Sequence, residues 1–493
     1  MTRGAALAGG LAFIALATLN AGGYRYGASD QAFYIPAILH QLDPSLYPRD
    51  WAMLGAQGKF FFVDEIFAAL VRVTGVALPF WFAAAQLATL TALAAGAYAL
   101  GRQVLDTPLA IAAWMAALTL RHRITKTGAN TLEGYFHPRM LVFAIGLFAL
   151  ADVLRGRRWR PLLITLLCGA IHPTTAALFV AIVTVAIGVS DVRWRRPLLA
   201  GATVTGVLAA LTLALGATPF DLTPMDAEWR ALVATKDYTF PTAWSPGTWA
   251  TNLAAPFVLV AVAWARRRDG RLTLREQGLI AGCLALVAGF LASLPFISAG
   301  VPLAVQLQTS RVFWPVEAVA VLYLVWWAVD RPARQGSVVW PRALAAVVVA
   351  VAVARGIYVG LVESPDRPTF AFDLPADDWA AALTWVRTST PSNTYVLADP
   401  SHAWEMGTAV RIGAARDVYL EETKDVAMAM YSRPAAHRVA ARITATQGFS
   451  AMSPDALRAL VAGDGPAVLV SERPLALPVL FQTGVIRVYA LTD

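Results

Sequence analysis

Acidic side chains follow the first apolar segment of the chain. Asp30 lies a few residues beyond that segment, in SDQAFYIP, and Asp50 closes the turn DPSLYPRD. Ionisable residues kept at a membrane edge are costly, which makes them functional candidates. Either carboxylate could accept a proton from a hydroxyl as a general base. The structural alternatives are a helix N-cap at Ser29–Asp30 and an ordinary proline-containing turn before Asp50.

The segment RHRITKTGANTLEGYFHPRM carries a second group of polar side chains. Glu133, His137 and Arg139 stand close together, directly before an apolar segment. Arg139 could hold a phosphate through two hydrogen bonds, or extend to lipid headgroups as an anchor. Glu133 and His137 are spaced i, i+4, but a glycine and a proline oppose a helix there. A metal site is therefore not supported.

Two further candidates stand where apolar segments break or begin. His172 precedes Pro173 in GAIHPTTAAL, and a proline disfavours the α-helical region for the residue before it. A helix should end at His172, whose ring could contact a phosphate or a substrate hydroxyl, or cap its own helix. Arg311 opens an apolar segment in LQTSRVFWPVEA. It could bind a pyrophosphate or phosphate diester, or anchor the helix at the interface.

The composition of the 493 residues defines the class of protein. Hydrophobic residues make up 57% of the chain, charged residues only 15%, and the mean hydropathy is +0.56. Such values, with recurring apolar runs near the roughly 18-residue spanning length, indicate a polytopic membrane protein. The net charge of +8 comes largely from arginines in short loops, so lipid headgroups rather than nucleic acid are the expected partners. Cys168 and Cys283 lie in apolar runs and predict neither a disulfide framework nor a zinc site.

Basic loops predict the topology. Arginine clusters at 155–160, 191–196, 266–275 and 330–342 are assigned to the cytoplasm. Because two of them flank residues 161–190, that stretch should be a hairpin broken at His172 rather than one crossing. About eleven spans follow, with a cytoplasmic N-terminus. They are predicted at 5–22, 79–100, 105–120, 138–154, 161–171, 173–189, 197–216, 248–265, 276–298, 312–329 and 342–361.

Two segments are predicted to lie outside the membrane, on the side away from the cytoplasm. The arm 23–78 contains an amphipathic segment, QAFYIPAILHQL, broken by Pro36, and a second one, FFVDEIFAALVRV. Proline and charge become frequent near residue 363, so we divide the chain into a membrane domain, 1–362, and a soluble α/β domain, 363–493. In the latter, TYVLAD and PAVLVSE read as strands, while DDWAAALTWVRTST and SPDALRALVA read as helices.

This combination of features resembles the GT-C superfamily of integral-membrane glycosyltransferases. In particular it is similar to the bacterial branch that uses polyprenyl-phosphate-linked sugars. The features are the arm with SDQAFYIP, the broken hairpin AIHPTT, about eleven spans and a C-terminal α/β domain, which together cover nearly the whole chain. Members carry a catalytic acidic residue in the first outer loop, which corresponds here to Asp30. A second acidic residue commonly follows in the family, and Gln31 stands in its place, so metal dependence is left open.

The resemblance implies inverting transfer of a sugar from a polyprenyl-phosphate-linked donor to an extracytoplasmic glycan, lipid or protein. Asp30 would be the base, with Asp50 as the other catalytic candidate. The lipid phosphate would be contacted by Arg139, His137, His172, Arg311 and Glu133. The soluble domain would bind the acceptor or position the arm. No cofactor is certain, and a divalent metal is not supported.

Two other classes of function stay open. A secondary transporter would also use broken helices and intramembrane charges, but its two halves should show corresponding interruptions, and one clear interruption is present. A non-catalytic membrane scaffold would use the outer domain to bind a partner and would tolerate loss of the cavity carboxylate. Frequent arginine and scarce lysine suit a GC-rich bacterium, so the bacterial inner membrane is the expected location.

Overall fold

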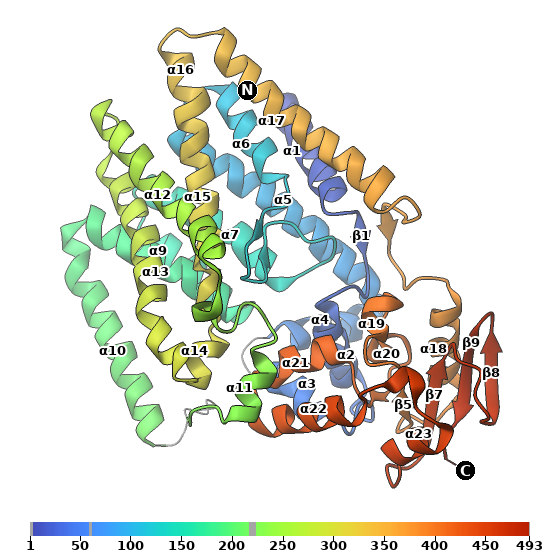
Figure 1. Ribbon diagram of the computed structural model, residues 1–493. Helices are drawn as coiled ribbons and strands as arrows, with labels where there is room; N and C mark the ends of the chain where they lie inside the picture. Colours follow the sequence, from blue (N-terminus) through green and yellow to red (C-terminus); the bar gives the residue numbers. More distant parts are fainter. Residues whose placement is uncertain (1–2, 59–61, 216–222, 493) are drawn as a thin grey trace. The chain divides into compact units, whose positions relative to one another are not determined.

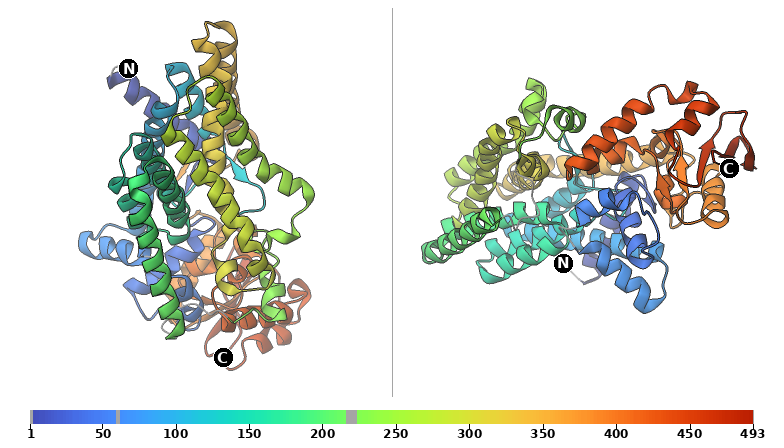
Figure 2. Two further views of the ribbon diagram at one scale, coloured as in Figure 1. Left: turned by 90° about the vertical axis from the view of Figure 1, so that its left-hand side faces the viewer. Right: turned by 90° about the horizontal axis from the view of Figure 1, so that it is seen from below.

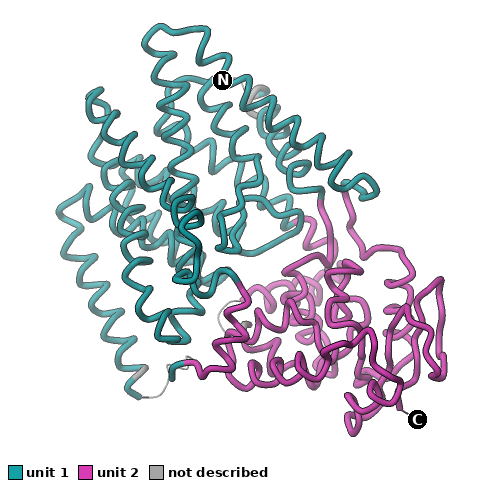
Figure 3. The backbone as a smooth tube through the Cα atoms, in the orientation of Figure 1, with its two compact units in different colours: residues 1–23, 85–224, 237–369 teal, residues 24–84, 225–236, 370–493 magenta. Residues whose placement is uncertain are grey.

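The computed structural model describes two compact units, coloured separately in Figure 3. The described residues are 3–58, 62–215 and 223–492. Unit 1 consists of 1–23, 85–224 and 237–369, and unit 2 of 24–84, 225–236 and 370–493. The arm and the C-terminal region thus share one unit, with a short piece from the middle of the chain. The division at residue 362 remains a prediction.

The secondary structure in the described residues of unit 1 is helical apart from one short hairpin, and the long helices run roughly side by side (Figures 1 and 2). Its α-helices are α1 (Arg3–Asn20), α5 (Leu78–Val104, in unit 1 from residue 85), α6 (Pro108–Leu118), α7 (Pro138–Leu154), α8 (Trp159–Leu167), α9 (Pro173–Ser190), α10 (Arg195–Ala214), α12 (Pro246–Arg268), α13 (Leu274–Ser298), α14 (Pro302–Gln306), α15 (Phe313–Val325), α16 (Arg331–Arg334) and α17 (Val339–Tyr358). The 3₁₀ and π segments are η1 (Cys168–Ala170), η2 (Val192–Trp194), η3 (Pro241–Ala243), η4 (Thr309–Val312), η5 (Trp326–Asp330) and η6 (Val359–Glu363). The hairpin pairs β2 (Arg123–Ile124) with β3 (Ala129–Asn130) in antiparallel fashion.

Local sequence explains where these helices begin. Proline stands at the first or second position of α6, α7, α9 and α12, where its missing N–H costs nothing. Thr107 and Ser245 cap α6 and α12, and Thr273 forms a capping box with Glu276 at the start of α13. Each apolar segment predicted as a span is helical over most of its length.

Within the described residues, six helical runs are long and apolar enough to cross a membrane, and the chain is a multi-pass membrane protein. They are Leu78–Val104, Pro173–Ser190, Pro246–Arg268, Leu274–Ser298, Pro302–Arg334 and Val339–Glu363. Shorter apolar helices include Pro108–Leu118 and Trp159–Ala170. The count of about eleven spans and the orientation of the termini remain predictions.

The structure confirms the break at His172 and the hairpin around it. α8 with η1 and then α9 fold back on each other, so the two basic loops meet. Arg158 pairs with Asp191 at 2.9 Å, and the rings of Trp159 and Trp194 make an edge-on contact at 4.6 Å. The two ends of residues 161–190 therefore lie at the same end of unit 1. α9 alone is long enough to span, whereas α8 is not.

Close backbone approach holds α9 against α13. A Cβ atom added at Gly278 would lie 2.4 Å from the Ala186 carbonyl oxygen, and one at Gly282 would lie 2.5 Å from that of Ile182. Glycines four residues apart present a flat surface against which a second helix can pack closely. This contact fixes the helix that carries His172 at its start.

Unit 2 is built on a five-stranded mixed sheet of order β6-β5-β7-β9-β8. The strands are β5 (Tyr395–Leu397), β6 (Asp417–Val418), β7 (Ala467–Ser471), β8 (Val479–Thr483) and β9 (Ile486–Ala490). β5 pairs in parallel with β6 and β7, whereas β9 is antiparallel to β7 and β8. The central strands β5 and β7 are buried along nearly their whole length, which explains their continuous apolar sequences.

Helices from three parts of the chain complete unit 2. They are α2 (Gln31–Leu42), α3 (Trp51–Gly58), α4 (Val63–Thr74), α11 (Ala227–Val233), α18 (Asp378–Ser389), α19 (His402–Glu405), α20 (Val410–Gly413), α21 (Glu422–Ala429), α22 (Arg433–Ala445) and α23 (Pro454–Leu460), with η7 (Phe449–Ala451). A short parallel pair joins β1 (Tyr24–Arg25) to β4 (Phe370–Ala371). The expected break of the first arm helix at Pro36 was wrong, because α2 continues through it. Pro36 is the sixth of the twelve residues of α2, and the helix continues although the proline lacks the backbone N–H of that position.

Candidate functional site

Two helices of unit 1 begin at a histidine followed by a proline. His137 caps α7, because its Nδ1 accepts a hydrogen bond from the Arg139 N–H at 3.2 Å. His172 caps α9 in the same way, accepting from the Thr175 N–H at 3.3 Å. A neutral imidazole that accepts at Nδ1 carries its proton on Nε2. Each ring therefore keeps an N–H donor that the helix cap does not use.

The two histidine rings lie together. Their centroids are 6.0 Å apart in an edge-on arrangement, and Tyr135 lies 6.1 Å from His137. Both histidines are buried. The N-termini of α7 and α9, which carry partial positive charge, thus converge on one place.

Arg139 and Arg311 add full positive charges to this place. Arg139 donates to Glu133 Oε1 at 2.6 Å, and both side chains are buried. Arg311, in η4, donates to the Thr127 carbonyl at 3.4 Å, and its guanidinium lies 5.6 Å from the Tyr238 ring centre. The structure thus brings together four residues singled out in the sequence: Glu133, His137, Arg139 and His172. Arg311 contacts Thr127, in the segment that leads to Glu133.

The loop that carries Glu133 is held on both of its sides. Asn130 Nδ2 donates to Glu133 Oε1 at 3.1 Å, and Gln86 Nε2 donates to the Glu133 carbonyl at 3.0 Å. A Cβ atom at Gly134 would lie 2.8 Å from the carbonyl oxygens of Ala21 and Gly23, so only glycine fits there. As expected, no helix forms over residues 131–137. Because the loop is fixed, the Glu133 carboxylate holds the Arg139 guanidinium in one orientation.

This arrangement suits an anion with several acceptor oxygens. Two guanidinium groups, two imidazole N–H groups and two helix N-termini together favour a phosphate. In the described part of the chain, no three His, Cys, Asp or Glu side chains gather in a metal-binding arrangement. We derive no step through a metal.

Asp30 belongs to unit 2 and precedes α2. It occupies the N-cap position, but its side chain makes no capping hydrogen bond; instead its Oδ1 accepts from Lys424 Nζ at 2.9 Å. The preceding Ser29 has a φ of 51°, a conformation that is strained for a residue with a side chain. Gln31 is buried and accepts the Gly27 N–H at 2.7 Å through Oε1. The Asp30 side chain therefore does not cap α2. Its carboxylate is 24% exposed to solvent and forms an ion pair with Lys424.

Asp50 lies elsewhere in unit 2, fully buried beside Arg411. Arg411 donates to Asp50 at 2.8 Å and binds Asp425 through two hydrogen bonds, at 2.6 and 3.1 Å. The Val418 N–H also donates to Asp50, at 3.1 Å. Burial opposes ionisation of Asp50, but the charges of Arg411 and its neighbours outweigh it and lower its pKa. We propose a structural role for Asp50, because no part of its carboxylate reaches solvent.

Sequence reasoning missed Lys424 and the network around Arg411. These partners are 394 and 361 residues away from Asp30 and Asp50, and no spacing rule connects such positions. A detectable signal was the run of charges in EETKD, but charge runs usually mark a solvated helix face. Glu317, in α15, lies 2.8 Å from the Nδ1 of His122 and forms an ion pair with it when that histidine is protonated.

The fold and the site describe a multi-pass membrane protein whose helical unit holds a cluster of histidine, arginine and glutamate side chains. No family model matches the chain, and no curated protein matches it. Among solved structures it is similar to the oligosaccharyltransferase of Archaeoglobus fulgidus in the apo form, at 14% identity and a TM-score of 0.47. The archaeal oligosaccharyltransferase AglB of the same organism, in complex with an inhibitory peptide and a dolichol-phosphate, gives 14% identity and a TM-score of 0.39. Each comparison covers 94% of this chain and 69% of the archaeal chain, and the likeness is distant.

Proposed function

We propose that this protein is a membrane glycosyltransferase that moves a sugar from a polyprenyl-phosphate-linked donor to an extracytoplasmic acceptor. The observation that carries the proposal is the meeting of two histidine-capped helix N-termini, one of which carries Arg139, while Arg311 is bound to Thr127 in the segment that leads to Glu133. These groups would bind the lipid phosphate and stabilise it as it leaves the sugar. A long lipid tail explains why the enzyme is embedded in a membrane.

In this proposal, Asp30 is the general base. It would take a proton from the acceptor hydroxyl as that oxygen attacks the anomeric carbon, with inversion at that carbon. Lys424 stabilises the ionised carboxylate that a base requires. Gln31 stands where the family commonly has a second acidic residue, and it is buried in the turn that presents Asp30.

The proposal includes an orientation. The loops at 155–160 and 191–196 would face the cytoplasm of a bacterial inner membrane. Residues 121–137, which carry Glu133, would then face outward. The proposal specifies neither the sugar nor the acceptor.

Transfer from a panel of radiolabelled polyprenyl-phosphate sugars tests the function. The purified chain in nanodiscs should transfer at least one sugar, and Asp30→Asn should lower kcat by about 10²-fold or more. Asp43→Asn is the matched control, since Asp43 lies in the same arm and is exposed. Activity of Asp30→Asn equal to wild type would contradict the assignment of the base. Inactivity of the wild type across the panel would favour a transporter or a scaffold.

A further inference from the structure

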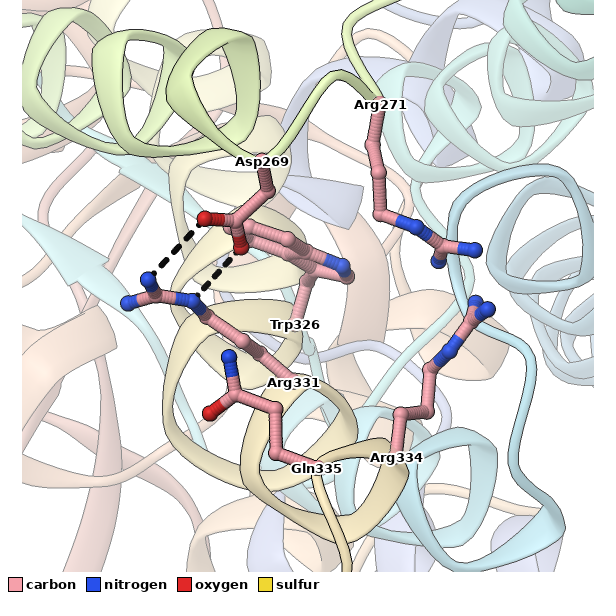
Figure 4. Close-up of a pocket in the computed structure, with 6 residues that line it drawn as sticks. All are labelled: Asp269, Arg271, Trp326, Arg331, Arg334 and Gln335. Atoms are coloured by element: carbon pink, nitrogen blue, oxygen red, sulfur yellow. Dashed lines mark hydrogen bonds and ion pairs between the residues drawn. The ribbon is translucent and has the colours of Figure 1, made fainter.

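A second charged cavity lies in unit 1, away from the histidine cluster in sequence. It has a volume of about 350 Å³ and is lined by Asp269, Arg271, Trp326, Arg331, Arg334 and Gln335 (Figure 4). These residues follow α12 and occupy η5, α16 and the residue after it. The volume falls within the roughly 300–1,000 Å³ of small-ligand sites.

The arginines around this cavity are held in place. Arg331 binds Asp269 through two hydrogen bonds, at 2.7 and 3.0 Å. Arg271 donates to Asp106 at 2.9 Å, and Arg334 pairs with the same carboxylate oxygen. Figure 4 shows the guanidinium groups of Arg271 and Arg334 facing each other on one side of the cavity. A guanidinium has five N–H donors, so one ion pair leaves most of them available to a ligand.

Asp330 fixes the loop that supplies Asp106. Its Oδ1 accepts from the N–H groups of Asp106 and Thr107, at 3.1 and 2.8 Å, and from the Thr107 hydroxyl at 2.9 Å. Asp330 is fully buried. The cavity itself is lined by three arginines and one aspartate, Asp269, so its lining carries an excess of positive charge.

Trp326 supplies a donor that nothing in the described chain uses. Its side chain is fully buried, and its Nε1–H has no hydrogen-bond partner among the described residues. Figure 4 shows this nitrogen directed toward the side occupied by Arg271 and Arg334. Leaving a buried N–H without an acceptor is unfavourable, so a ligand that supplies an acceptor at this position would be stabilised. Trp326 also begins the π-helical segment η5, an irregularity often found at functional sites.

Exposed tryptophans place this cavity at the level of a membrane surface. Trp264, Trp327 and Trp340 are 60%, 48% and 62% exposed, and they stand on the helix ends that adjoin the cavity. Tryptophan side chains concentrate where the bilayer meets water. A basic pocket at this level, on the side of arginine-rich loops, can bind the headgroup of an anionic lipid.

We propose that this cavity binds a phosphoryl group, supplied by the headgroup of an anionic phospholipid. Arg271 and Arg334 contact its oxygens from one side, and Trp326 Nε1 donates to it from the buried end. Arg331 remains on Asp269 and closes the opposite side. This site is independent of the proposed transfer reaction, and its test does not use activity.

Native mass spectrometry of the full chain measures lipid retention directly. Protein is equilibrated with phosphatidylglycerol, with phosphatidylcholine, or with free glycerol 3-phosphate. Wild type should retain phosphatidylglycerol selectively. Arg271→Gln and Arg334→Gln should each lower retention about fivefold, as expected for one basic group near a charged headgroup. Trp326→Phe keeps the ring but loses the N–H, and should lower retention about two- to tenfold.

Arg267→Gln is the matched control, because Arg267 is exposed in the same turn and does not line the cavity. This variant should retain as much phosphatidylglycerol as wild type. Such a result would show that binding depends on the cavity and not on a general attraction of anionic lipid to basic loops. Wild type could instead retain no lipid but be thermally stabilised by glycerol 3-phosphate, with the stabilisation lost in Arg271→Gln and Arg334→Gln. This result would support a phosphoryl site whose ligand is a free phosphate ester rather than a lipid. Equal lipid retention in all variants, with no response to the free ester, would overturn the proposal.

Discussion

At the scale of single residues, His172 combines two roles on two different atoms. Its Nδ1 caps α9, and its Nε2 remains free to donate toward the cluster formed with His137, Arg139 and Arg311. Replacement of His172 by alanine would remove both the helix cap and the ring N–H donor, so a loss of activity in that variant would not distinguish the two roles. The two roles can nevertheless be separated by the choice of substitution.

His172→Asn should keep the cap, because asparagine is among the preferred N-cap residues, but it lacks the imidazole donor. We expect thermal stability close to wild type and transfer lowered about tenfold or more, as for loss of a hydrogen bond to a charged group. His172→Ala should lose about 0.5–2 kcal/mol of stability as well. Thermal unfolding and donor kinetics measure the two effects. Full activity of His172→Asn would limit His172 to the capping role.

Glu421 should make the stability of unit 2 depend on pH. Burial raises the pKa of Glu421 to about 7, although Arg411 lowers it in part. From its ordinary value of 4.5 up to 7, the folded unit holds a proton that the unfolded chain has lost, so stability falls as pH rises. The total loss is about 3 kcal/mol. His402, whose pKa burial lowers to about 4, has the opposite effect below its ordinary value of 6.5.

Comparison of Glu421→Gln with wild type isolates the glutamate. The variant should be more stable at pH 8 by up to about 3 kcal/mol, and equally stable near pH 4. Hydrogen exchange of peptides from 405–430 gives the opening free energies. Glu422→Gln serves as the control, since that side chain is exposed. A Glu421→Gln advantage that does not grow with pH would contradict the raised pKa.

The sequence identified residues that lie at helix starts, but not those paired across the chain. His172 and Arg139 could be found because proline and the apolar segments fix their positions. Lys424 and Arg411 could not, because their partners are hundreds of residues away and depend on the three-dimensional arrangement of unit 2.

At the scale of elements, the contact of α9 with α13 rests on two glycines. Gly278→Ala and Gly282→Ala would each place a Cβ within about 2.5 Å of a backbone oxygen of α9, so the helices must separate. We expect lower thermal stability and weaker transfer, because α9 carries His172. Gly289→Ala on the same helix meets nothing within 4 Å and should be neutral or stabilising by up to about 1 kcal/mol. Equal behaviour of the three variants would show that close packing here is dispensable.

Periodicity and caps predicted most elements of the chain. The helices starting at Gln31, Asp378 and Pro454 and the strands β5 and β7 occur where they were expected. α3 was missed, because its eight residues are too few to show a period. The segment 225–236 was missed as part of unit 2, since its contacts are with residues about 200 positions away: Trp229 donates to the Ala429 carbonyl at 2.9 Å, and Arg433 donates to Asp226 at 2.8 Å.

At the scale of the whole molecule, the hairpin of α8 and α9 decides the topology of all later helices. Arg157→Cys and Arg193→Cys should both react with an impermeant thiol reagent from the cytoplasmic side only, whereas Asp237→Cys should react from the outer side. The native Cys168 and Cys283 are buried and should give little background. Labelling of positions 157 and 193 from opposite sides would mean that residues 161–190 cross once, and the predicted orientation would then fail.

Unit 2 also constrains the order in which the protein is made. Asp50 meets its partner Arg411 only after 361 further residues have been synthesised, which takes roughly 20–70 s at bacterial and eukaryotic elongation rates. During that interval the arm 24–84 has neither Arg411 nor the strand β4 to pair with. The nascent arm must therefore remain incompletely folded while the helices of unit 1 are synthesised. In a chain that stops before residue 370, the arm would lack both partners permanently.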